Sequence, residues 1–398
     1  MTTTSTADTS CAVFRKLPSE LLKPDAIYRF VVGEDNGLRK LSTAEASVEL
    51  GDPFATLLLL QGTFPRTAGE VLSALSAAAP DGDPLGKAMF FLVGEGSQIP
   101  FTPETRSLQR NLRFLASTGA VESEGPDVLL SSFHPDRGDV ELMAWDRVAG
   151  GFNYYQTVGN VSAWVFAGNS RHALLEGTEF KGPFESHMSG NFLMKELRSP
   201  WLHWHSPDAP VPPNVFDEDD PLANHPWFRN RERLGAITCE IDVARPSIRR
   251  WTRARFVALK AGGAIERPDR IIQQVLDTPT VNLITSHTES STAAAGFEPE
   301  VDLPQTFFID SERLTETLGL QAPPPFSVAA PIYAQSLNTF EFHLSDGGNF
   351  RRAGDTHFAF AVPEPAFEDV AVLREAIDVG FITSRLAACL LMTDYPNP

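Results

Sequence analysis

From about Val128 onward, the chain is a series of short strand-like segments separated by turns rich in Gly, Pro and Asp. The clearest pair is Val140 to Trp145 and Phe152 to Thr157, which flank a turn that contains Asp146 and Gly150. Short strands joined by tight turns favour antiparallel hairpins. A regular alternation of strands with crossover helices is missing. The sequence therefore predicts an α+β fold with an antiparallel β-rich core and peripheral helices.

The region before these strands reads as mixed and mainly helical. Thr67 with Glu70 three residues later matches a capping box, in which a hydroxyl caps the first turn of a helix. Thr102 precedes a proline, and Leu112 and Leu115 follow at helical spacing, so a second helix is expected to end at a glycine after them. Both segments are interpreted as scaffold.

These patterns divide the chain into three parts. We expect a disordered tail at residues 1–10, a mainly helical N-terminal region at 11–125 and an α+β domain at 126–398 that carries the candidate site. The tail, MTTTSTADTS, has no basic residue and no apolar run, so neither a secretory signal nor a transit peptide is visible.

Charge and cysteine content limit the possible partners and compartments. The chain has 33 Lys and Arg against 51 Asp and Glu, a net charge of −18, which argues against nucleic acids and anionic membranes as partners. Cys11, Cys239 and Cys389 are too few and too widely spaced for a disulfide framework. The apolar stretch Phe381 to Met392 is too short to span a bilayer and is interpreted as a buried helix. We expect a soluble cytoplasmic protein, with its oligomeric state left open.

The segment Gly182 to Asp208 concentrates three of the nine histidines. His203 and His205 lie in a strand-like stretch, where alternate side chains point to one face about 7 Å apart. His187 precedes a hairpin that would bring it near this pair, and Glu185 lies two residues before it. Three histidines with an open position suit zinc, copper or iron, and two histidines with one carboxylate form the facial triad of non-haem iron oxygenases.

A non-metal interpretation of this segment stays open. Trp201 and Trp204 then face a core, and the paired histidines are exposed or hydrogen bonded along a polar face.

Arginines are concentrated on one expected helix. Pro246 begins a helical pattern, and Arg245, Arg249 and Arg253 recur every four residues along one face. Guanidinium groups so placed can bind a carboxylate, a phosphate or the propionates of a haem. The alternative is that they pair with the acidic residues of the protein itself.

Two weaker motifs complete the set of candidates. Gly168 to His172 resembles a nucleophile elbow around Ser170, although a histidine replaces its second glycine, and the alternative is a strand end where Ser170 caps a helix. Near the C-terminus, a hairpin centred on Phe350 would place His343 opposite His357.

These features favour a soluble metal-dependent enzyme, an oxidoreductase with a mononuclear histidine-rich site that acts on a small organic substrate. The arginine face is compatible with an anionic substrate. One alternative is a haem-dependent oxidoreductase, which needs a single axial histidine and leaves no sequence motif to find. Another is a binding or assembly protein without catalysis, in which the histidines are incidental.

Overall fold

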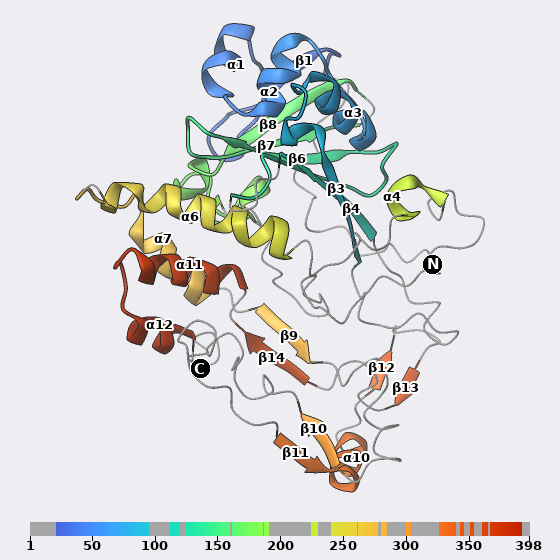
Figure 1. Ribbon diagram of the computed structural model, residues 1–398, viewed down its shortest axis with the longest axis vertical. Helices are drawn as coiled ribbons and strands as arrows, with labels where there is room; N and C mark the ends of the chain where they lie inside the picture. Colours follow the sequence, from blue (N-terminus) through green and yellow to red (C-terminus); the bar gives the residue numbers. More distant parts are fainter. Residues whose placement is uncertain are drawn as a thin grey trace. The chain divides into compact units, whose positions relative to one another are not determined.

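The computed structural model describes residues 21–94, 112–119, 124–159, 161–185, 187–190, 224–229, 240–260, 262–277, 280–284, 300–303, 326–339, 343–345, 351–353, 360–364 and 367–391 (Figure 1). It forms two compact units. Unit 1 comprises Met1–Leu92, Arg113–Met194 and Thr238–Ile271, and unit 2 comprises Val93–Leu112, Lys195–Ile237 and Ile272–Pro398. The tail expected at residues 1–10 lies outside the described residues.

The main element of unit 1 is an eight-stranded sheet. Its strand order is β2-β1-β8-β7-β6-β5-β4-β3. The strands are β1 Ala26–Arg29, β2 Arg39–Lys40, β3 Ala88–Gly94, β4 Leu112–Thr118, β5 Val128–Ser132, β6 Val140–Asp146, β7 Gly151–Thr157 and β8 Ala163–Asn169.

Strand pairing in this sheet is mostly antiparallel. β4 to β8 pair in sequence with their neighbours, which confirms the hairpin expected at Asp146 and Gly150. β1 instead runs parallel to β8, with Ala26 opposite Ala163. The two strands therefore end at the same edge, and the loops that follow them meet there.

The N-terminal region contributes strands as well as helices, so its mainly helical character is not confirmed. The sheet crosses residue 125, because β1 to β4 lie before it and β5 to β8 after it. The helix expected to include Leu112 and Leu115 is wrong, because Leu112–Thr118 is strand β4 and pairs with β5. Phe114 and Ala116 are fully buried, as expected for alternate residues on the inner face of a strand. Burial of this face favours a strand over the helix that the leucine spacing predicts.

Side-chain caps are present at the start of three helices of unit 1, α1 Thr43–Glu49, α2 Pro53–Leu57 and α3 Ala68–Ala78. Thr67 accepts a hydrogen bond from the backbone of Glu70 at 3.2 Å, which confirms the helix start expected there. The motif is not a full capping box, because the Glu70 carboxylate accepts from the backbone N–H of Arg66 and not from that of Thr67. The described helices of this unit are these three and α6 Arg245–Lys260. Helix α7, Pro268–Asp277, begins in the last residues of unit 1.

Strand β7 is buried along its whole length, and its two faces contact different elements. Tyr155 packs against Phe54 of α2 with ring centroids 5.3 Å apart. Tyr154 points to the other face and packs against Phe184 at 5.4 Å. Successive strand residues point to opposite faces. Helix α2 therefore covers one face of the sheet, whereas the segment around Phe184 covers the other.

A buried carboxylate joins α2 to the sheet. Asp52 is inaccessible to solvent, caps α2 by accepting from Ala55 at 3.0 Å, and accepts further bonds from Asn153 at 2.8 Å and from the Tyr155 hydroxyl. Burial raises the pKa of Asp52, and these donors oppose the shift. Its three hydrogen bonds meet the need of a buried carboxylate for partners.

The described residues of unit 2 form three two-stranded sheets, which pair β10 with β11, β12 with β13 and β14 with β9. Its elements are α4 Pro226–Arg229, β9 Thr280–Ile284, β10 Glu300–Leu303, β11 Phe326–Ala329, α10 Ala330–Thr339, β12 His343–Ser345, β13 Arg351–Ala353, β14 Phe360–Glu364, α11 Phe367–Asp378 and α12 Ser384–Leu391.

Two expectations in unit 2 are tested directly. The hairpin near the C-terminus exists, but His343 lies opposite Ala353, so the expected pairing with His357 is wrong. The observed pairing joins the two strands by a shorter connection than a pairing of His343 with His357 requires. Helix α12 is found where the buried helix was expected, with Ala387 buried and Leu386 exposed, so only one of its faces packs. Within the described residues, no helix has the length and apolar character that crossing a membrane requires.

The Asp52 contacts predict a large effect of its removal. In Asp52→Ala, α2 loses its cap and two buried donors lose their acceptor, so the free energy of unfolding should fall by at least about 2 kcal/mol. Chemical denaturation measures this change. Exposed Asp81 is the matched control, and Asp81→Ala should change the free energy by less than about 0.5 kcal/mol. Equal effects of the two substitutions would contradict this role of Asp52.

Candidate functional site

The described part of the expected metal site is a run of single helical turns after β8. These are η5 His172–Leu174, η6 Gly182–Glu185 and η7 Met188–Gly190. His187 lies between the last two, is half-buried, and donates its backbone N–H to Pro183 at 2.9 Å. Glu185 is exposed. His203 and His205 lie outside the described residues, so their participation stays a prediction.

A buried serine fastens this run of turns to the sheet. The Ser170 hydroxyl donates to the carbonyl of Gly190 at 2.8 Å and accepts from the backbone of Phe152 at 3.0 Å. Ser170 is inaccessible to solvent, so it is not an exposed nucleophile. The side chain that caps the turn after β8 is Asn169, which accepts from the backbone of Arg171 and His172. The structure therefore supports neither form of the motif expected at Ser170.

The contact at Gly190 admits no side chain. A Cβ placed there would lie 2.5 Å from the Ser170 carbonyl oxygen, and the backbone has a φ of 71°. Ser189 also has a positive φ of 54°, which is uncommon for a residue with a side chain. Its carbonyl accepts a hydrogen bond from the indole of Trp251 at 2.9 Å. These contacts hold the end of the run in one conformation.

The imidazole of His187 rests on an aromatic surface. Its centroid lies 5.2 Å from that of Tyr154, and Phe184 packs against the same tyrosine ring. Burial raises the pKa of Tyr154, whose hydroxyl is hydrogen bonded to Ser170 and is therefore a neutral structural group. His187 is positioned by β7 and by its own turn, with part of its surface open to solvent.

Among the described residues, no three His, Cys, Asp or Glu side chains are grouped so that they could hold a metal ion. His187 and Glu185 would supply at most two donors from one turn. A complete mononuclear site therefore needs donors from elsewhere in the chain.

The arginine face lies on α6, so the expected helix is confirmed. Arg245 is its first residue, Arg249 is half-buried and Arg253 is exposed. Binding of a cofactor by these three residues stays a prediction.

Arg250, which lies beside the expected face, has an internal partner. Its guanidinium bonds to Asp127 at 2.9 Å and lies 4.5 Å from the centroid of the Trp145 ring. The sequence spacing did not single out this residue, although it contacts the sheet.

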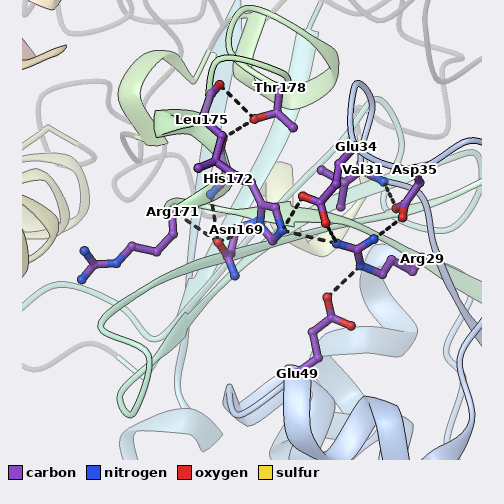
Figure 2. A network of polar contacts seen from close by, with 10 residues as sticks. All are labelled: Arg29, Val31, Glu34, Asp35, Glu49, Asn169, Arg171, His172, Leu175 and Thr178. Carbon is purple, nitrogen blue, oxygen red and sulfur yellow. Dashed lines mark hydrogen bonds and ion pairs between the residues drawn. The ribbon is translucent and has the colours of Figure 1, made fainter. Parts of the chain in front are cut away.

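A second polar cluster lies where parallel strands β1 and β8 end, and Figure 2 shows its members. Arg29 bonds to Glu34 at 2.6 Å, to Glu49 at 2.8 Å and to Asp35. His172 lies beside this group, with Nε2 3.2 Å from a Glu34 oxygen. We call these five residues the Arg29 network. When His172 is neutral, Arg29 is the one positive group of the network and pairs with all three carboxylates.

Both ring nitrogens of His172 have polar neighbours. Nδ1 lies 3.1 Å from the backbone nitrogen of Asn169 and 2.8 Å from the side-chain oxygen of Asn169, and Nε2 lies 3.2 Å from a Glu34 oxygen and 3.4 Å from an Arg29 nitrogen. These contacts fit either neutral tautomer. Burial lowers the pKa of His172, the Glu34 carboxylate opposes this shift, and the Arg29 charge adds to it. The neutral imidazole is therefore favoured in the folded protein.

No family model, no curated protein and no solved structure matches this chain. Any function must therefore be argued from its own residues.

The tight contact at Gly190 predicts a penalty beyond backbone strain. Gly262 has a similar φ of 76°, and no atom lies within 4 Å of the position that a Cβ would take there, so Gly262→Ala reports the strain of a left-handed residue alone. Gly190→Ala adds an overlap with Ser170 and should lower the free energy of unfolding by about 1–3 kcal/mol more. Denaturant titration of both variants measures the difference. Equal losses would show that the run is not held against Ser170.

The lowered pKa of His172 predicts a pH effect. A histidine whose pKa is depressed on folding stabilises the protein above its ordinary pKa of 6.5, and this contribution is lost as the pH falls. The free energy of unfolding of His172→Gln should therefore fall less between about pH 7 and pH 5 than that of the unsubstituted protein. His225→Gln, outside the network, is the control. Identical pH profiles for His172→Gln and the unsubstituted protein would contradict the assignment.

Proposed function

We propose that the chain is a metal-dependent enzyme, an oxidoreductase whose single transition-metal ion is held by His187 with His203 and His205. The observation that carries the proposal is the fixed position of the His187 imidazole on Tyr154, 5.2 Å between ring centroids, at the end of a clamped segment. A half-buried imidazole that is held in position loses little freedom when it binds a metal.

The surroundings of His187 support the proposal. Tyr154 and Phe184 provide an apolar surface beside the imidazole, and such a surface limits solvent access and tunes a metal. Glu185 is exposed on the same turn and is the fourth candidate donor. When bound, iron, copper or zinc would polarise or oxidise a small organic substrate at its open position.

The chain's own groups would divide the remaining tasks. His187 binds the metal, whereas Tyr154 and the Ser170 contact orient the turn that carries it. Arg249 and Arg253, on exposed or half-buried positions of α6, are the proposed partners of an anionic substrate or cofactor group.

Metal content of protein prepared without an affinity tag tests the proposal. We expect about one iron, copper or zinc per chain, and loss of that metal in His187→Ala, in His203→Ala and in His205→Ala. His343→Ala is the control and should retain the metal. Circular dichroism verifies that each variant is folded.

Two outcomes would contradict this proposal. One is the absence of a stoichiometric metal from the unsubstituted protein, and the other is full retention in all three histidine variants. An absorption band near 400 nm in the same sample would assign the iron to haem and favour the alternative of one axial histidine.

A further inference from the structure

Arg255, on α6, is a buried cation without a carboxylate partner among the described residues. Its relative exposure is 5%, and its one hydrogen bond to these residues runs from a terminal nitrogen to the carbonyl of Arg267 at 3.2 Å. The buried Nε has no acceptor. Within the described part of the chain, no carboxylate forms an ion pair with it. Arg250, from the same helix, has such a partner in Asp127. Buried charges usually have partners, so Arg255 needs an explanation.

A second guanidinium lies on the same aromatic ring. Arg171 is 5.1 Å and Arg255 is 5.9 Å from the centroid of the Trp251 ring. The indole is itself fixed, because its N–H donates to Ser189. The Arg171 side chain is 37% exposed and pairs with Glu266 at 2.7 Å. The ring therefore has a buried arginine and a surface arginine against it.

The carboxylates nearest to Arg255 form their ion pairs with other arginines. Glu266 bonds to Arg171, and Asp269 bonds to Arg267 at 2.8 Å. Burial lowers the pKa of Arg255 to about 10, the positive charge of Arg171 adds to the shift, and the charges of Glu266 and Asp269 oppose it in part. The guanidinium is still charged at neutral pH. Two positive groups thus share one ring, and the buried one has unused hydrogen-bonding capacity.

We infer that Arg171 and Arg255 form a binding site for an oxyanion, the phosphate or carboxylate group of a small ligand, beside Trp251. Guanidinium groups bind both anions through paired N–H donors, and an arginine against an aromatic ring is held ready to do so. The ligand would replace Glu266 on Arg171 and supply the missing negative charge to Arg255. This site uses none of the residues of the proposed metal site.

The position of Glu266 makes it a built-in competitor. Its side chain is 47% exposed, so it can leave Arg171 without breaking a buried contact. The −18 charge of the chain repels anions in general. Saturable anion binding therefore requires a site of this kind.

Isothermal titration calorimetry with inorganic phosphate, and separately with acetate, at constant ionic strength and neutral pH tests the inference. We expect saturable binding of at least one anion. Binding of phosphate indicates a phosphate group on the ligand, and binding of acetate indicates a carboxylate group. Arg255→Met and Arg171→Gln should weaken binding at least about tenfold, because each removes charge-assisted hydrogen bonds. Glu266→Gln should strengthen it, because Arg171 then has no competing carboxylate. Arg137→Gln, at an exposed position outside both proposed sites, should leave it unchanged.

Opposite directions for Arg171→Gln and Glu266→Gln are not expected of a merely structural cluster. If Arg255→Met does not fold, these two surface variants decide. The inference is overturned if neither anion binds saturably, if Glu266→Gln does not strengthen binding, or if Arg137→Gln weakens binding as much as Arg171→Gln does.

Discussion

The hydroxyl of Ser170 is the contact on which the described site depends. It joins the start of β7, through Phe152, to the end of the run of turns at Gly190. A buried serine hydroxyl has one donor and two acceptor positions, and removal of this one would leave the Phe152 N–H and the Gly190 carbonyl unpaired. The tyrosine beneath His187 is bonded to the same serine. The Ser170 side chain therefore links the segment that carries His187 to the sheet.

Three arginines of unit 1 with little solvent exposure have different partners. Arg29 is shared by three carboxylates, and Arg250 lies against an aromatic ring and pairs with a buried aspartate. Arg255 has an aromatic ring and a carbonyl but no carboxylate among the described residues. The cost of burying a guanidinium is offset in the first two cases by an ion pair. The third is the exception that a ligand would explain.

Local patterns predicted part of this structure and missed contacts between distant segments. The β6–β7 hairpin, the α3 cap and α6 were predictable, because turn residues, a capping hydroxyl and a proline each act within a few positions. Strand β4 was mistaken for a helix, since two leucines at helical spacing say nothing about the neighbouring strand. The contact of His172 with the Arg29 network could not be predicted, because it forms only when β1 pairs in parallel with β8. Likewise, Arg255 differs from Arg253 only in what packs around α6.

The proposed metal site requires that imidazoles, including that of His187, bind one metal ion. X-ray absorption spectroscopy at the edge of the metal retained by untagged protein tests this requirement most directly. We expect scattering from at least two imidazole rings with metal–nitrogen distances of about 2.0–2.1 Å, and a loss of one ring's contribution or of the metal in His187→Ala. A spectrum without imidazole scattering, or one that His187→Ala leaves unchanged, would contradict it.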